Sequence, residues 1–483
     1  MTTRDGFYLQ NDNDLLQKGL RCAGAINPPT NVGGKRLRVY NVIVVGAGYS
    51  GLTACRDLCI AGFNVLLLEA RDRIGGRTFT AEVDGHLYEM GGTWVHWNQP
   101  HTYREMSRYG LTELLLSHDK SVGVNYYTAL LNGNRQIIDH GKAHAMTEKA
   151  FRKLCDVDGK LGREVMPLPH DPHFNPKVKA WEKMSVAQRL DQIRHDVTED
   201  EITLLQARLS SIYGADMDKA GFFDVLRWWA LGGYTMDGLY ETGDEFKLPT
   251  GQSSFARCFF DEALKTQNLA YSFNTAAEII QDKGDRVIVN QHWEAKRLIC
   301  TLPLNLLEHV RFDPPLDTAK MAAATRPGNI NHGAKVHLEV QGDALRSWSS
   351  ASFPVTRACS AFGDGTTARG TTHLVSFGVN KSFSTPEEDA RDYVADCKRL
   401  HDMDVKKTIW HNWSTDPYSR GSWCMYPPNY SFEHLSALQK RHGSILFANS
   451  DWAMGWRGYI DGAIERGGLA AKEVSEEVFS SKI

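Results

Sequence analysis

The feature that most constrains this chain is a strand–turn–helix pattern near residue 46. The apolar, β-branched run NVIVV (41–45) predicts a strand buried on both faces. It is followed by Gly46, Gly48 and Gly51 in the spacing Gly-x-Gly-x-x-Gly. Such glycines permit, in that order, a tight turn, a close approach of the backbone to a pyrophosphate, and close packing of helix on strand. The pattern predicts a dinucleotide at a helix N-terminus.

The residues after this turn complete a βαβ unit. The stretch after Gly48 predicts a helix that ends at Gly62, and NVLLL (64–68) predicts a second strand. Glu69 closes that strand, at a distance suited to accepting a hydrogen bond from a ribose 2′-hydroxyl. This part of the chain is therefore expected to be α/β and Rossmann-like.

Composition excludes several other classes of protein. A length of 483 residues predicts two domains, and a net charge of −3 without a basic stripe argues against nucleic-acid binding. Nine scattered cysteines without Cys-x-x-Cys argue against a disulfide framework and a zinc site, so no metal is expected. The sequence has neither a signal-peptide core nor an apolar run of about 18 residues, which predicts no secretion and no membrane span.

The order of patterns predicts a discontinuous dinucleotide domain with a second domain inserted. A helical region near 147–245, with a capping box from Thr198 to Glu201, is followed by short apolar strands at 286–307. AKVHLEV (334–340) alternates as a half-buried strand does, and the last residues return to a strand and a helix. The predicted parts are an extended N-terminal arm, 1–37; a dinucleotide-binding domain, 38–110, 250–310 and 440–483; and a substrate-binding α+β domain, 111–249 and 311–439.

Four separated motifs resemble those of one enzyme family. They are, in chain order, EARDRIGGR (69–77), EMGGTWVH (89–96), CTLPLNLL (300–307) and FANSDWAMGWRGYIDGAIERG (447–467). With the βαβ unit, they resemble the FAD-dependent amine oxidases, and among these the soluble fungal monoamine oxidases. The resemblance covers nearly the whole chain and implies the amine-oxidase fold with FAD as cofactor. The segment after Glu69 disfavours a nicotinamide dehydrogenase.

The resemblance implies roles in FAD binding for seventeen residues. Arg71 and Arg77 would place positive charge beside the pyrophosphate, Asp451 would hold the ribityl or pyrophosphate part, and Ala277 the adenine edge. The helix that begins at Ile460 would direct its N–H groups at the flavin. The full set is Gly46, Gly48, Ser50, Gly51, Glu69, Ala70, Arg71, Gly76, Arg77, Gly91, Gly92, Thr93, Trp94, Ala277, Trp413, Asp451 and Ile460.

FAD is expected to be bound non-covalently. Membrane-bound animal relatives tether FAD through a cysteine, and the matching position here is Ser422, whose hydroxyl cannot form that thioether. Cys424, two residues further on, is interpreted as a packing residue.

The resemblance also implies three catalytic residues. Trp423 and Tyr459 match the two rings that flank the path to the flavin, and Lys335 matches a lysine that holds a water at flavin N5. Without the resemblance, Trp423 would be assigned to core packing and Lys335 to a solvated strand face. The inserted helical region is expected to shape the substrate pocket, with Leu231, Tyr234, Met236 and Phe246 as lining.

The expected reaction is oxidation of a small-molecule amine by FAD with O₂ as oxidant, giving H₂O₂. Two enzymatic alternatives stay open: an amino-acid oxidase, with Arg457 or Arg420 binding the substrate carboxylate, and an alkaloid or indole tailoring oxidase. A non-catalytic flavoprotein scaffold is a third functional alternative. For the oligomeric state, a homodimer stays open. The sequence ends in Ser-Lys-Ile, one residue from the peroxisomal signal Ser-Lys-Leu, which suits an enzyme that releases peroxide.

Overall fold

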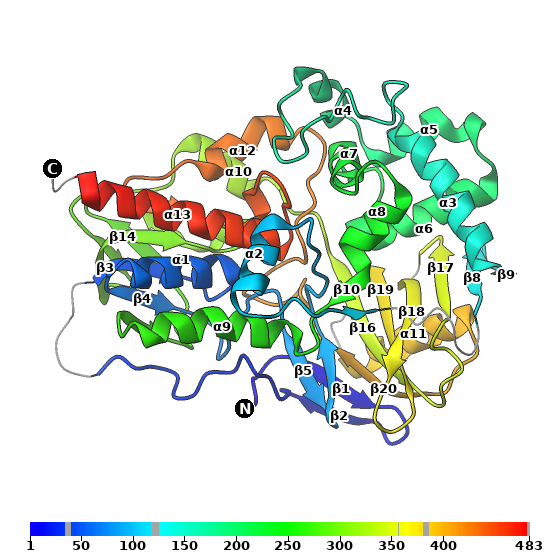
Figure 1. Cartoon of the computed structure of the whole chain (residues 1–483), viewed down its shortest axis with the longest axis horizontal. Coiled ribbons are helices and arrows are strands. Elements are labelled where there is room, and N and C mark those ends of the chain that lie inside the picture. The colour runs from blue at the N-terminus through cyan, green and yellow to red at the C-terminus, as the bar shows by residue number, and fades with distance from the viewer. Residues whose placement is uncertain (34–39, 118–124, 356, 380–385, 481–483) are drawn as a thin grey trace.

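The computed structural model describes residues 1–33, 40–117, 125–355, 357–379 and 386–480. Two sheets organise these residues, and Figure 1 shows them side by side, each with its own layer of helices. The last three residues, Ser-Lys-Ile, lie outside the described residues.

The first sheet has eight strands and a parallel centre. β3 (Tyr40–Val45) lies between β4 (Val65–Leu68) and β14 (Trp293–Cys300), and all three run parallel. The sheet also contains β11 (Leu269–Ser272), β12 (Ile279–Asp282), β13 (Val287–Val289), β15 (Arg311–Asp313) and β21 (Ile445–Phe447). Three separated stretches of chain supply these strands, which matches the predicted discontinuous Rossmann-like fold. The exact domain boundaries stay predictions.

Helices cover both faces of this sheet. One face packs on α1 (Tyr49–Ile60), α9 (Gly251–Lys265) and α13 (Ile460–Ser480), and Figure 1 shows α1 between the other two. The other face packs on α10 (Thr318–Thr325) and α12 (Ser431–Gln439). Burial on both faces explains why β3 and β4 are uninterrupted apolar runs rather than alternating ones. α2 (Pro100–Arg108) packs beside α13.

The second sheet has nine strands and lies beside the first sheet, under the inserted helices (Figure 1). Their order is β2 (Leu15–Lys18), β1 (Phe7–Gln10), β20 (Val405–Trp410), β16 (Gly333–Val340), β19 (Thr372–Val379), β18 (Ala358–Thr366), β17 (Ser349–Phe353), β8 (Tyr127–Leu131) and β9 (Asn134–Ile138). Two short pairs accompany the sheets: β5 (Thr80–Val83) with β6 (His86–Glu89), and β7 (Leu115–Leu116) with β10 (Phe246–Lys247).

The N-terminal residues correct the prediction of an extended arm. β1 and β2 form a hairpin, and β1 adds to the sheet by pairing with β20, so that Phe7 lies opposite Trp410. Their rings stack with centroids 5.4 Å apart, and Leu9 is completely buried. The alternation of apolar residues in this short segment was masked by its polar neighbours, so the hairpin was not predicted.

The inserted helices cover the second sheet. They are α3 (His140–Cys155), α4 (Lys179–Glu182), α5 (Val186–Ile193), α6 (Glu199–Tyr213), α7 (Phe222–Leu231) and α8 (Met236–Tyr240), with a short π-helical turn, η3 (Glu241–Glu245). The predicted capping box is present at α6: Thr198 Oγ1 accepts from the Glu201 N–H, and the Glu201 carboxylate accepts from the Thr198 N–H. α11 (Pro386–Leu400) contacts β17, β18 and β20. The residues that the structure describes also contain four 3₁₀ turns: η1 (Pro176–Val178), η2 (Arg194–Asp196), η4 (Leu304–His309) and η5 (Ser450–Trp452).

β16 differs from the half-buried strand that its alternation predicts. All eight of its residues are buried. Val336 and Leu338 pack in an apolar cluster on one face, whereas Lys335 and His337 point at residues 89–93, a segment of the other half of the molecule. The polar face is therefore covered by protein rather than by water, and Lys335 is only 4% exposed.

Candidate active site

A cavity of about 480 Å³ runs between the two sheets. Most of the residues predicted to bind FAD or act in catalysis contribute to its lining. They are Gly46, Gly48, Ser50, Glu69, Ala70, Arg71, Gly76, Arg77, Gly91, Gly92, Thr93, Trp94, Ala277, Lys335, Trp413, Trp423, Tyr459 and Ile460. The roles of the individual residues stay predictions, but the structure brings these separated segments to one site.

The glycine-rich turn forms one end of the cavity. Gly46 has a φ of +104°, which favours glycine, and a Cβ added at Gly51 would lie 1.9 Å from the Gly46 carbonyl oxygen. Gly51 therefore allows α1 to pack against the turn and does not itself line the cavity. Gly48, the N-cap of α1, makes no side-chain capping hydrogen bond, and the first turn contains no acidic residue. Free backbone N–H groups at a helix N-terminus fit a pyrophosphate.

Glu69 is placed where an acceptor for a ribose is expected. It is 7% exposed, and its carboxylate accepts hydrogen bonds from the backbone N–H groups of Ala47 (2.6 Å) and Arg71 (2.8 Å). These two bonds fix the carboxylate at the cavity wall, and each oxygen retains a lone pair for a further donor.

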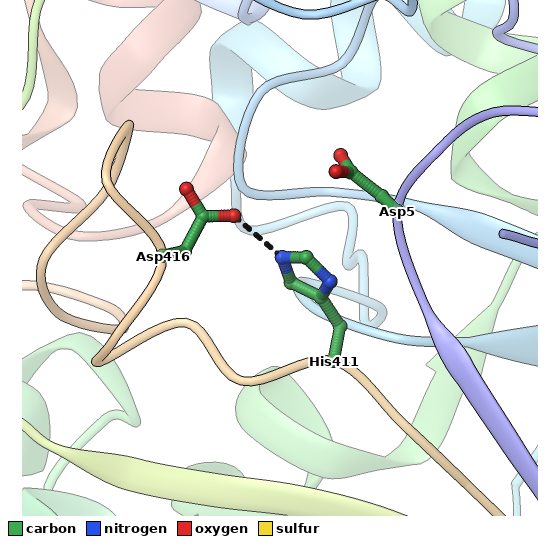
Figure 2. Close-up of side chains that lie close together, drawn as sticks. All are labelled: Asp5, His411 and Asp416. Atoms are coloured by element: carbon green, nitrogen blue, oxygen red, sulfur yellow. Dashed lines mark hydrogen bonds and ion pairs between the residues drawn. The ribbon is translucent and has the colours of Figure 1, made fainter. Parts of the chain in front are cut away.

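Arg71 lies in a charge-compensated cluster with residues of the N-terminal segment. It donates to Asp5 (3.0 Å) and to Asp416 (2.7 Å), and Arg73 also donates to Asp5 (2.8 Å). Figure 2 shows Asp5, His411 and Asp416 converging, with a hydrogen bond between the latter two. Although these three residues have the spacing of a metal site, two arginines already balance the two carboxylates, so the cluster has no excess negative charge for a dication.

The pKa values in this cluster agree with that interpretation. Burial would raise the pKa of Asp416, but the hydrogen bonds from His411 and Arg71 hold it well below its usual range. Burial lowers the pKa of His411, against the opposing effect of Asp416. Arg71 is thus a fixed cation held at the cavity wall rather than a free positive charge.

Arg77 is the second predicted phosphate ligand, and Asp451 holds it in place. Asp451 is completely buried; one carboxylate oxygen accepts from Arg77 (2.6 Å) and the other from the Leu304 N–H (3.0 Å). Arg77 also donates to the Ser422 carbonyl (2.9 Å). Asp451 itself is not part of the cavity lining, so the structure favours a positioning role for it, through Arg77, over the direct contact that the resemblance implied.

A glycine, a tryptophan and the start of α13 shape the part of the cavity expected to hold the flavin. A Cβ added at Gly91 would lie 2.1 Å from the Arg77 carbonyl oxygen, so only glycine fits there. The Trp413 indole N–H donates to the Met90 carbonyl (2.9 Å), which fixes its ring at the wall. Ile460 begins α13 at the same place.

Lys335 is a buried lysine at the cavity wall. Its ammonium donates to the Thr93 hydroxyl and to the Gly91 carbonyl (3.2 Å), and it lies 4.5 Å from the Trp94 ring centroid. Burial lowers the pKa of Lys335, and the nearby Glu89 carboxylate opposes this shift only in part. A lysine whose pKa is lowered inside a cavity is a common feature of functional sites.

Aromatic rings form the walls next to Lys335. The Trp423 indole N–H donates to the Ile212 carbonyl (2.8 Å), and its ring packs edge-to-face on Phe377, with centroids 6.1 Å apart. Tyr459 packs edge-to-face on Trp228, with centroids 5.4 Å apart. Both predicted ring positions therefore face the cavity with their orientations fixed.

Ser422 and Cys424 differ in their access to the cavity. Ser422 lines it, and its hydroxyl donates to the Gly333 carbonyl (2.7 Å). Cys424 is fully buried against Trp452 and Tyr426 and does not line the cavity, and burial raises the pKa of its thiol well above its usual range. This placement agrees with the interpretation of Cys424 as a packing residue.

The four residues expected to line the substrate pocket lie elsewhere. Leu231 and Met236 are buried within the helical layer, the Tyr234 hydroxyl donates to the Met166 carbonyl (2.6 Å), and Phe246 packs on Trp97. None of them lines the cavity, because this part of the chain turns its apolar side toward its own core. The helical residues that do line it are Arg208, Ser211, Ile212 and Trp228, with Gly243 and Asp244 from η3.

The two arginines proposed for an amino-acid oxidase do not line the cavity either. Arg457 is completely buried, where it donates to Asp224 and stacks on Tyr426 at 3.8 Å. The Arg420 carbonyl accepts from the Asn305 side-chain amide (2.8 Å), and its backbone N–H donates to the Asp416 carbonyl (3.0 Å). Sequence reasoning missed Arg208 and Asp244, because a charged residue on an amphipathic helix is normally assigned to its solvent face.

Among the described residues, every helix is too short or too polar to cross a bilayer. This agrees with the absence of an apolar run of sufficient length in the sequence.

Comparison with known proteins identifies the family. A family model described as flavin-containing amine oxidoreductase matches residues 49–475. The chain is 30% identical over 452 residues to a pseudooxynicotine dehydrogenase from a Pseudomonas species, covering 91% of this chain and 86% of that protein. It is also 30% identical over 449 residues to a nicotine dehydrogenase from Pseudomonas putida, covering 90% and 88%.

A solved structure shows the same fold. The cyclohexylamine oxidase from Brevibacterium oxydans superposes with a TM-score of 0.73 at 20% identity, covering 91% of this chain and all (100%) of that one. The match of the family model over most of the chain, the relatives at 30% identity and the cavity at the end of the βαβ unit agree with one another. The chain therefore belongs to the flavin-containing amine oxidoreductase family, an enzyme family whose cofactor is FAD.

Proposed function

We propose that this protein is a monoamine oxidase that binds FAD non-covalently. The glycine-rich turn, Glu69 and Arg77 would hold FAD in the cavity, where it would supply a hydride acceptor for the carbon next to the amine nitrogen and a source of two electrons for O₂. The overall reaction converts amine and O₂ to imine and H₂O₂, and water then hydrolyses the imine to an aldehyde or ketone and ammonia. The observation that carries the proposal is the continuous cavity from the uncapped N-terminus of α1 to the aromatic walls beside Lys335.

The aromatic walls select and orient the substrate. Trp423, Tyr459, Trp228 and Phe377 present mostly apolar surface to the cavity. Such a setting disfavours a charged ammonium group and favours the neutral amine, whose lone pair assists hydride loss. Fixed rings hold the amine in one orientation, which lowers the entropic part of the barrier.

Lys335 serves the oxidative half of the reaction in this proposal. Its ammonium, held by Thr93 and Gly91, provides a positive charge and a proton donor at the edge of the cavity. A cation in a place with little water stabilises negative charge that develops as O₂ is reduced.

The test measures oxygen consumption and peroxide release by the purified yellow protein with primary, secondary and aromatic amines. We expect one H₂O₂ formed per O₂ consumed, with a carbonyl product. A protein that keeps its flavin but oxidises no amine under any condition would refute the proposal and would favour the scaffold alternative.

A second candidate is an amine dehydrogenase that uses an acceptor other than O₂. It is favoured by the two relatives at 30% identity, both of which are named dehydrogenases. Slow reoxidation of the amine-reduced enzyme by air, with fast reoxidation by an added electron acceptor, would select this candidate. An alkaloid tailoring oxidase would instead show turnover only with a complex amine.

We also propose a peroxisomal location from the Ser-Lys-Ile terminus, which lies outside the described residues. A fluorescent protein that carries this tripeptide should enter peroxisomes, whereas one ending in Ser-Lys-Asp should not.

A further inference from the structure

The N-terminal segment (residues 1–33) connects the two sheets between which the cavity runs. β1 pairs with β20 of the second sheet, whereas Thr30 forms a β-bridge with Ser272, the last residue of β11 in the first sheet. Figure 1 shows this segment, in dark blue, passing from the second sheet to the first. The family model begins at residue 49, so the N-terminal segment lies outside the region that it matches.

Asp5 of this segment binds two arginines of the motif EARDRIGGR. Its carboxylate accepts from Arg71 (3.0 Å) and from Arg73 (2.8 Å). Arg71 is buried and lines the cavity, whereas Arg73 is completely buried and does not line it. Asp5 therefore joins an arginine at the cavity wall to one that is fixed in the protein interior.

The next residue of the segment reaches the same arginine by a second route. The Gly6 N–H donates to His411 Nδ1 (3.2 Å), and His411 Nε2 donates to one Asp416 oxygen (2.7 Å). The other Asp416 oxygen accepts from Arg71 (2.7 Å). Because Nδ1 accepts from Gly6, the imidazole proton is on Nε2, where Asp416 accepts it. Both carboxylates that hold Arg71, drawn on either side of His411 in Figure 2, therefore depend on two adjacent residues of the N-terminal segment.

The balance of charge makes the contact with Asp5 important. The two arginines are paired with Asp5 and Asp416, whereas the neighbouring carboxylates of Glu69 and Asp72 accept from backbone N–H groups and, for Asp72, also from the Thr3 hydroxyl. Without Asp5, two buried guanidinium groups would share one carboxylate, which is unfavourable. The arginine in the interior also donates to three backbone carbonyls, so the one at the cavity wall would move.

We propose that the N-terminal segment completes the FAD site, with Asp5 and Gly6 as positioning residues that hold Arg71 at the cavity wall. A guanidinium that is already held in place loses little further rotamer freedom when FAD binds beside it. FAD and the docked segment therefore stabilise each other, because the coupling between two binding events is reciprocal. The inference concerns binding of the cofactor and does not depend on which amine is oxidised.

The first test titrates the FAD-free parent, Asp5→Asn and Asp14→Asn with FAD and follows flavin fluorescence. Asp14 is the matched control, because it lies in the same segment but forms an exposed ion pair with Arg391 (3.1 Å). Removing a negative charge near the site would, by Coulomb attraction alone, tighten binding of the FAD diphosphate. We expect Asp5→Asn to raise the Kd of FAD by about 2- to 12-fold instead, and Asp14→Asn to leave it unchanged. In an Arg71→Met background, Asp5→Asn should no longer change the Kd, because the side chain that it positions is gone.

The second test needs no variant and compares hydrogen exchange of backbone amides in the FAD-free and FAD-bound parent. β9 is the internal reference, because it forms the opposite edge of the sheet to which β1 belongs. FAD should slow exchange in β1 by about 2- to 12-fold more than in β9. Unchanged or tighter FAD binding in Asp5→Asn, an effect of Asp5→Asn that persists without Arg71, or equal protection of β1 and β9 would each overturn the proposal. None of these measurements requires turnover of an amine, so failure of the proposed function would not affect them.

Discussion

Gly48 and Gly51 provide a matched pair of substitutions. Gly48 leaves room beside the glycine-rich turn, whereas Gly51 allows α1 to pack against that turn. Gly48 has an extended backbone (φ −74°, ψ 175°), and a Cβ there would meet only the Gly76 Cα, at 3.8 Å. Gly48→Ala is therefore compatible with the protein and should stabilise the FAD-free form by about 0.4–1 kcal/mol. The added methyl group would project where the pyrophosphate is expected, which should cost about 1–3 kcal/mol of FAD binding, or about 5- to 150-fold in Kd.

Gly51→Ala should act on the fold itself. The new Cβ would lie 1.9 Å from the Gly46 carbonyl oxygen, well inside van der Waals contact, so α1 must move away from the turn by roughly 1 Å. This overpacking should destabilise the FAD-free protein by about 1–3 kcal/mol or more.

The assay compares thermal unfolding of the FAD-free proteins and titrates each with FAD by flavin fluorescence. Gly33→Ala is the control, because a Cβ there meets nothing within 4 Å. Unchanged FAD affinity in Gly48→Ala would show that the cofactor does not lie over the N-terminus of α1. Unchanged stability of Gly51→Ala would refute the packing argument.

Three further predictions follow from single residues. Lys335→Met should slow reoxidation of reduced flavin by O₂ more than it weakens amine binding, and equal reoxidation in stopped-flow measurements would exclude this role. Burial raises the pKa of the Asp461 carboxyl from 3.8 to about 7. As pH rises, the unfolded chain therefore loses this proton before the folded protein does. The free energy of unfolding consequently falls between about pH 4 and about pH 7. Asp461→Asn should therefore gain stability relative to the parent by up to about 4 kcal/mol above pH 7 and lose that gain near pH 4, as measured by denaturant unfolding at both pH values. Acid precipitation should release all of the flavin into solution, in the parent and in Cys424→Ser alike; flavin that stays with the precipitate of the parent alone would indicate a covalent bond.

The dinucleotide half of the protein was the most predictable part. A strand–turn–helix connection requires glycine at positions 46, 48 and 51, and the structure has such a connection there. The capping box at Thr198 and the helix from Ile460 are equally local signals, and both elements are present. Such features depend on a few neighbouring residues, so sequence is sufficient to find them.

The substrate half was less predictable, because its residues meet across long distances in the chain. The alternation in β16 indicates two faces but not that residues 89–93 cover the polar one. The direction in which α6 and η3 face the cavity depends on how the helical layer packs on the second sheet. Leu231 and Met236 were thus expected at the cavity, where Arg208 and Asp244 lie instead.

Oxidation of amines by FAD bound in the cavity is tested most directly by a single turnover without oxygen. The holoenzyme is mixed anaerobically with one amine at a time, including amino acids, and the absorbance of oxidised flavin is followed. We expect at least one amine to bleach the flavin, and air to restore the colour with release of one H₂O₂ per flavin. Flavin that dithionite reduces but no amine bleaches would contradict this expectation.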